Sequence, residues 1–260
     1  MKQLRSMILA ACSLFLLTAC VTEVTNPVFN VDTSDEEALE NYLQLAVGYL
    51  EENDLESAKR HLRNAAAIDA NNSEMFGTWG LIYAREGETD LADDNFRRAL
   101  RVDRSNSRVR NNYAAFLFAQ ARFDDAYEQL EEVVSDTDYQ QRPQAFENMG
   151  IAALRLNRMD DAETAFTRAL QLNPNQLRSA LELTAINLNR GDVLQARAFW
   201  RNYLTLIQFY RVGHNPRSLL IGARLEQELE NEANARQYGE LLRTNFPESN
   251  EYAMFQQEFE

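Results

Sequence analysis

Three pairs of adjacent aspartates are the residues whose type and spacing most suggest chemistry. They are Asp93-Asp94, Asp124-Asp125 and Asp160-Asp161. Paired carboxylates can move protons to and from a substrate or hold a metal ion. Each pair, however, falls in the first turns of a predicted helix, where negative charge complements the helix dipole. We interpret the pairs as solvent-exposed helix starts, and a hydrolase that uses one of them is the alternative from a different functional class.

The remaining residues give little support to an enzyme. His61 and His214 are the only histidines, and neither has a Cys or His neighbour that would complete a metal site. The sequence has no glycine-rich phosphate loop, no Gly-x-Ser-x-Gly elbow and no His-Glu-x-x-His helix. We therefore expect no catalytic residues, no metal and no cofactor.

The N-terminus has the plan of a secretory signal. Lys2 and Arg5 precede an apolar run over residues 7–17, which is too short to span a bilayer as a helix. Residues 1–19 are thus expected to be a signal peptide. The sequence Leu17-Thr18-Ala19-Cys20 resembles the bacterial lipobox, so we predict cleavage before Cys20 and a lipid (palmitate) on that cysteine. A plain secreted protein and an uncleaved anchor are the alternatives.

Lipidation at Cys20 would fix the protein to a membrane, because one acyl chain binds weakly whereas two or more bind firmly. Val21 follows the cysteine, and by resemblance to Gram-negative lipoproteins the absence of Asp there implies delivery to the outer membrane by the lipoprotein sorting machinery. Residues 20–36 are predicted to be a flexible tether. The expected location is the outer membrane, lipid-anchored and facing the periplasm.

The charge of the chain limits its partners. The 260 residues carry a net charge of −14, and removal of Lys2 and Arg5 with the signal leaves 24 basic and 40 acidic residues, or −16. Nucleic acid and a bare anionic membrane surface are therefore poor partners. Since Cys12 lies in the signal, the mature chain keeps one cysteine and cannot form an internal disulfide.

The elements that carry these residues follow a repeat. Small residues recur at a spacing of 34, the tetratricopeptide (TPR) period. Gly or Ala at the eighth and twentieth positions lets two helices approach closely, and aromatic or Leu residues fill the space to the next repeat. The prediction is an all-α, superhelical solenoid over 37–249, with an insertion at 211–215 and a capping tail at 250–260. Its six TPR repeats are 39–72, 73–106, 107–142, 143–176, 177–210 and 216–249.

The concave face of such a solenoid is the expected binding surface. It is lined by the second, fifth, ninth, twelfth and thirteenth positions of each first helix. An apolar row there predicts a groove for an apolar strand or helix of a partner; coverage of the row by the tether or by the edge of the first repeat is equally open. The candidate groove residues are Leu43, Val47, Leu50, Leu81 and Ala84.

Several stretches go beyond general TPR character. They are 110–113, 116–117, 124–127, 146–150, 217–222, 224–225, Pro247 and 251–252. In these stretches the sequence resembles the type IV pilus biogenesis lipoproteins PilF and PilW, the pilotins of the pilus secretin. It departs from them at Ala114-Ala115, where glycines are common. The resemblance covers the lipobox, the tether, all six repeats and the tail.

This resemblance implies a scaffold that binds the secretin subunit of the type IV pilus machinery. The lipid would then direct the complex to the outer membrane, where the secretin multimerises, as pilus assembly and twitching motility require. The alternative in the same class is another envelope TPR lipoprotein, an adaptor for outer-membrane protein assembly or for cell-wall hydrolases.

Overall fold

The computed structural model describes residues 34–259. The chain divides into two units, Met1–Ala38 and Leu39–Glu260, and the packing described below is that of the second unit. The predicted signal peptide, the lipidation site Cys20 and most of the predicted tether lie outside the described residues. No helix within 34–259 has the length and apolar character needed to cross a membrane.

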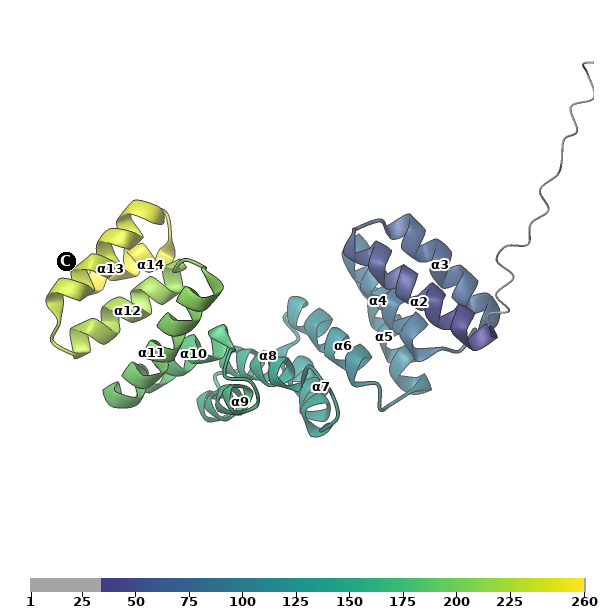
Figure 1. The fold of residues 1–260 in the computed structure, drawn as a ribbon, viewed down its shortest axis with the longest axis horizontal. Coiled ribbons are helices and arrows are strands. Elements are labelled where there is room, and N and C mark those ends of the chain that lie inside the picture. The colour runs from purple at the N-terminus through teal and green to yellow at the C-terminus, as the bar shows by residue number, and fades with distance from the viewer. Residues whose placement is uncertain (1–33, 260) are drawn as a thin grey trace, which may run out of the picture. The chain divides into compact units, whose positions relative to one another are not determined.

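Residues 34–259 form thirteen helices and no strand, arranged as six consecutive pairs and one final helix (Figure 1). The fold is an all-α TPR solenoid, as the 34-residue spacing predicts. The pairs are α2 (Asp35–Glu51) with α3 (Leu55–Ile68), α4 (Ser73–Glu86) with α5 (Thr89–Val102), α6 (Ser107–Ala119) with α7 (Phe123–Ser135), α8 (Arg142–Arg155) with α9 (Met159–Leu172), α10 (Leu177–Asn189) with α11 (Val193–Tyr210), and α12 (Pro216–Glu228) with α13 (Glu232–Asn245); α14 (Asn250–Phe259) follows.

The close approach within each pair comes from the small residues that the repeat pattern identifies. At the eighth and twentieth positions the side chains are Ala, Gly or Thr, and every one of them is buried. Gly150 shows why size matters, because a Cβ there would lie 2.7 Å from Phe166 Cε1. The twelve positions are Ala46, Ala58, Gly80, Ala92, Ala114, Ala126, Gly150, Ala162, Thr184, Ala196, Ala223 and Ala235.

The turn inside each repeat contains one residue in the left-handed region of backbone conformation. Two of these residues are glycines, for which positive φ is free of steric cost, and the others carry a Cβ that makes the conformation less favourable. The six turn residues are Asn53, Gly87, Ala121, Asn157, Gly191 and Glu230. One reversal per repeat brings the second helix back against the first.

The first helix begins earlier than predicted. Ser34 Oγ accepts a hydrogen bond from the Glu37 backbone N–H at 3.2 Å, as an N-cap side chain does. Asp35, Glu36 and Glu37 then form an acidic first turn that complements the helix dipole. The predicted tether over 20–36 is therefore wrong at its last two residues, which are helical.

The predicted insertion at 211–215 joins α11 to α12 and packs against aromatic rings. α11 has 18 residues, and Arg211 ends it with φ of 54°. His214 then lies with its ring centroid 5.8 Å from that of Trp200 and 5.9 Å from that of Tyr203. Asn215 caps α12 in a capping box with Ser218. The segment thus anchors the start of the sixth repeat.

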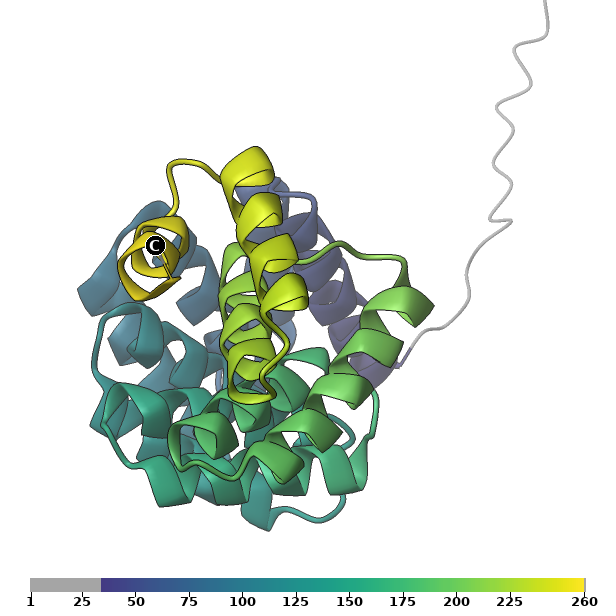
Figure 2. The same cartoon turned by 90° about the vertical axis from the view of Figure 1, so that its left-hand side faces the viewer.

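The tail after the sixth repeat is the amphipathic helix α14, which contacts both α12 and α13 (Figure 2). Phe255 is buried with Leu219, Leu220 and Leu242, and Phe259 packs against the same cluster. A Cβ at Gly239 would lie only 2.1 Å from Phe255 Cζ, so α14 sits against bare backbone of α13. This helix covers apolar side chains that the last pair would otherwise expose.

Candidate functional site: the groove of the first helices

The groove residues predicted on the first two repeats fall into two groups. Leu43, Val47, Leu81 and Ala84 are half-buried, and Leu43, Leu81 and Ala84 pack against the core. They keep some surface on the first helices, where a partner could contact them.

Leu50 does not belong to this surface, and its assignment to the groove is wrong. Its side chain is 4% exposed, because it follows Ala46 by one helical turn on the face that packs inward. Its backbone carbonyl accepts a hydrogen bond from the Arg85 guanidinium. Leu50 therefore contributes to the core of the first repeats and is not available to a ligand.

A clearer hollow lies over the middle repeats, which the sequence prediction did not single out. Two cavities of about 650 and 160 Å³ share Phe118, Ile151 and Arg178, so they form one continuous depression, here called the central groove. Its apolar floor comes from first helices: Phe118 from α6, Ile151 and Leu154 from α8, and Leu181 from α10.

The repeat pattern contains the signal for these residues. Ala115 and Ile151 occupy the ninth positions of the third and fourth repeats, and Phe118 and Leu154 occupy the twelfth. These are the positions that predict Val47, Leu81 and Ala84 in the first two repeats. Taken over all repeats, the ninth and twelfth positions therefore include residues of the central groove. Position alone, however, does not distinguish an exposed side chain from a buried one.

Two arginines at the central groove have no acidic partner. In the described part of the chain the side chains of Arg155 and Arg178 make no hydrogen bond or ion pair, and both residues are exposed. Arg155 lies 6.0 Å from the centroid of the Phe123 ring, a weak cation–π contact. The groove therefore presents positive charge in a chain whose net charge is −14.

The acidic residues beside the central groove are already paired. Glu182 is buried and accepts bidentate hydrogen bonds from Arg217, at 2.9 Å from Nε and 2.5 Å from Nη2, which raise the pKa of that guanidinium. Glu147 is buried as well, and its Oε2 accepts the backbone N–H and the hydroxyl of Ser179 at 3.0 and 2.8 Å. Ser179 lies in the first turn of α10, so Glu147 caps that helix across the repeat boundary.

One aspartate of each of the three pairs has a structural explanation. Asp93, Asp124 and Asp160 each form an ion pair with an arginine in the intra-repeat turn of the following repeat. The partners are Arg122, Arg158 and Arg190 respectively. Within the described residues no group of three His, Cys, Asp or Glu side chains could hold a metal ion. The geometry thus assigns these carboxylates to the joints between repeats.

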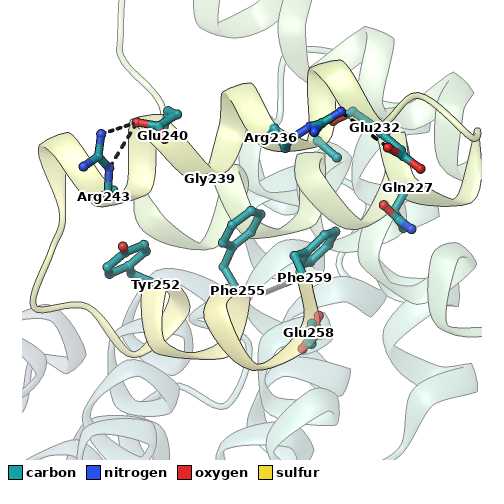
Figure 3. A pocket seen from close by; sticks show the side chains of 11 residues that line it. Gln227, Glu232, Arg236, Gly239, Glu240, Arg243, Tyr252, Phe255, Glu258 and Phe259 are labelled. Atoms are coloured by element: carbon teal, nitrogen blue, oxygen red, sulfur yellow. Dashed lines mark hydrogen bonds and ion pairs between the residues drawn. The ribbon is translucent and has the colours of Figure 1, made fainter.

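A second hollow of about 440 Å³ lies at the C-terminal end of the solenoid, between α13 and α14 (Figure 3). Phe255 and Phe259 stack with their ring centroids 4.5 Å apart and point toward α13 beside Gly239. Its rim carries the ion pairs Glu232–Arg236 and Glu240–Arg243. Because the rim charges are balanced and the rings belong to the cap, this hollow is a weaker candidate for binding than the central groove.

Comparison with known proteins gives the family. The tetratricopeptide repeat family matches residues 143–176. The chain is 37% identical over 247 residues to the type IV pilus assembly protein PilF of Pseudomonas aeruginosa, covering 93% of this chain and 94% of that protein. A solved structure from the functional characterisation of Pseudomonas aeruginosa PilF superposes with a TM-score of 0.80 at 36% identity, covering 87% of this chain and all of that one.

The crystal structure of PilW, described as a widely conserved type IV pilus biogenesis factor, shows the same fold with a TM-score of 0.68 at 24% identity, covering 84% of this chain and 98% of that one. The sequence match to PilF covers 93% of the chain, well beyond a single repeat. The chain therefore belongs to the family of the type IV pilus assembly protein PilF, as a TPR protein of type IV pilus biogenesis.

Proposed function

We propose that this protein is a pilotin. In this proposal the lipid on Cys20 anchors it to the outer membrane, facing the periplasm, after transport by the lipoprotein sorting machinery. The first repeats hold an apolar segment of a secretin subunit and so bring the secretin to the membrane in which it multimerises. The family membership of the chain supports a role in pilus assembly, and the lipobox at Leu17–Cys20 supports the anchor.

The observation that carries the secretin-binding step is the apolar row on the first helices. The row is only half-buried in Leu43, Val47, Leu81 and Ala84. Full burial of a Leu or Val side chain contributes about 1.5 to 3 kcal/mol to stability. A partner segment that covers them would gain part of this free energy. Leu50 has no part in the proposal, because it is already inside the core.

The test exploits two leucines two residues apart on α2. Leu43 belongs to the proposed row, whereas Leu45 is 45% exposed and points to another side of the helix. We expect Leu43→Glu to abolish capture of the secretin and Leu45→Glu to leave it intact. Because Leu43 also contacts the core, thermal unfolding of both variants must be followed by circular dichroism, and Leu43→Ser provides a milder variant at the same position.

The cellular measurement is the amount of heat- and detergent-resistant secretin multimer in outer membranes. Deletion of the gene should remove the multimers, and Cys20→Ala should leave them in the inner membrane. Normal multimers in both strains would contradict the pilotin role. Recovery of barrel-assembly proteins or cell-wall hydrolases, in place of secretin, would favour the envelope-adaptor alternative.

A further inference from the structure

The central groove combines apolar surface that remains partly uncovered with two arginines that form no ion pair within the described chain. Phe118, Ile151 and Leu154 leave apolar surface in the depression. Arg155 and Arg178 place two guanidinium groups at the same depression without a hydrogen-bonded partner among the described residues. An apolar floor beside unpaired arginines fits a ligand that presents apolar groups and a negative charge together.

Neighbouring carboxylates cannot neutralise these arginines without losing contacts of their own. Glu182 is 8% exposed and is held by Arg217, and Glu147 is 6% exposed and is held by Ser179. Glu147 also accepts the Ser179 N–H in the first turn of α10, so this backbone group is not free to bind an anion. The positive charge at the groove is therefore a property of the two arginine side chains.

An amide group in the groove indicates the class of ligand. Asn148 lines the smaller cavity, and its Oδ1 accepts a hydrogen bond from Gln144 Nε2 at 3.3 Å. Its Nδ2 has no acceptor within the described chain and can donate to a backbone carbonyl of a bound peptide. A fatty acid offers an apolar chain and a carboxylate, yet it has no second polar group for this amide.

We propose that the central groove binds a short peptide segment of a partner protein in which Asp or Glu stands beside two apolar residues. The apolar side chains contact Phe118, Ile151 and Leu154, and the carboxylate pairs with Arg178 and Arg155. The proposal is independent of the pilotin role, because it uses the third to fifth repeats, whereas the proposed secretin contact uses the first two.

The experiment is a selection with the full chain as cells produce it, held in phosphatidylcholine nanodiscs, against a phage library of short random peptides. We expect enrichment of sequences that place Asp or Glu next to Leu, Ile or Phe. A selected peptide is then synthesised in its acidic form and with Lys in place of the acidic residue, and the affinity of each form is measured by fluorescence anisotropy.

Arg178→Glu supplies a test that a change in stability alone would not reproduce. This variant should bind the acidic peptide with an affinity lower by about tenfold or more, and it should bind the lysine form more tightly, because the charge preference of the groove is reversed. Arg197→Glu on α11 is the matched control, since Arg197 is an exposed arginine that lines neither cavity of the groove. The Leu43→Glu variant should bind the acidic peptide normally, so that failure of the pilotin proposal remains a separate result.

Several outcomes would overturn the inference. These are a selection with no acidic bias, an unchanged preference in Arg178→Glu, or equal losses in Arg178→Glu and Arg197→Glu. If no peptide binds, and decanoate instead binds saturably in a way that Arg178→Glu abolishes, the groove would be assigned to an acyl ligand. A dimer that Arg178→Glu converts to a monomer in sedimentation, without any peptide binding, would assign it to self-association.

Discussion

His214 is a titratable side chain enclosed by aromatic rings. Its ring lies among Trp200, Tyr203 and Tyr238, and its Nδ1 is 3.1 Å from Ser218 Oγ. Burial lowers the pKa of this imidazole below its ordinary value of 6.5, because the protonated form loses hydration that the rings do not replace. The neutral form is therefore the one that the folded protein favours.

This shift predicts a dependence of stability on pH. Between the lowered folded pKa and the unfolded value near 6.5, the unfolded chain binds a proton that the folded chain does not, so stability falls as pH falls through this window. We expect a lower urea midpoint at about pH 5.5 than at about pH 7.5. The His214→Gln variant should show a smaller difference between the two midpoints, and an identical difference would contradict the assignment.

At the residue scale, the sequence predicts what depends on residue type and spacing. The small residues at the eighth and twentieth positions were identifiable because only Gly, Ala and similarly small side chains permit helices to approach so closely. Exposure is harder to predict, because it depends on the neighbouring repeat. Leu50 and Phe118 both occupy twelfth positions, yet Leu50 is buried and Phe118 lines a groove.

At the scale of elements, two kinds of polar contact join successive repeats. Glu147 reaches from α8 to the first turn of α10 and is 6% exposed. Asp124, at the start of α7, pairs with Arg158 in the next repeat at 2.9 Å, with side chains that are 67% and 44% exposed. Burial decides which contact matters, since exposed ion pairs contribute little whereas a buried donor without a partner is costly.

Replacement of these two carboxylates should therefore have different effects. Glu147→Ala leaves the Ser179 N–H and hydroxyl without their acceptor and should lower the free energy of unfolding by about 1 to 3 kcal/mol. Asp124→Ala should lower it by less than about 1 kcal/mol. Chemical denaturation of both variants measures the difference, and a larger effect of Asp124→Ala would contradict this ranking.

The boundaries of elements were less predictable than their existence. Repeat spacing places each helix pair, but the end of a helix depends on a few local contacts. Ser34 starts α2 before the predicted end of the tether, and the fifth repeat contains the longest helix of the described chain, α11. Thr184 in this repeat fits its small-residue position because its hydroxyl donates to the Ala180 carbonyl at 2.8 Å.

At the scale of the whole solenoid, each repeat contacts mainly its neighbours, and stability is expected to be a sum of local terms. The ends of such a stack are its weak points, because an end repeat has a neighbour on one side only. At the C-terminal end, α14 takes the place of the missing neighbour. Its Phe255 packs against Gly239, and its Glu258 forms an ion pair with Arg224, which lowers the pKa of Glu258.

Two glycine substitutions test this arrangement. Gly239→Ala should displace α14 from α13 and destabilise the protein by about 1 to 3 kcal/mol. Gly48→Ala has nothing within 4 Å of its added Cβ and should stabilise the protein by about 0.5 to 1 kcal/mol. Hydrogen exchange followed by mass spectrometry should show faster exchange in α12–α14 of Gly239→Ala and unchanged exchange in α4–α7. Loss of protection along the whole chain would show instead that the solenoid unfolds as one cooperative unit.

The ion pairs between repeats also bear on how such a chain can change its length. Asp93, Asp124 and Asp160 each form an ion pair with an arginine in the turn of the following repeat, so the third and fourth repeats carry both halves of the joint, an aspartate for the next repeat and an arginine for the preceding one. A gene segment encoding either of these two repeats could be duplicated in frame, and the new copy would meet a complementary partner on each side. Lengthening by whole copies of these repeats thus preserves the joints.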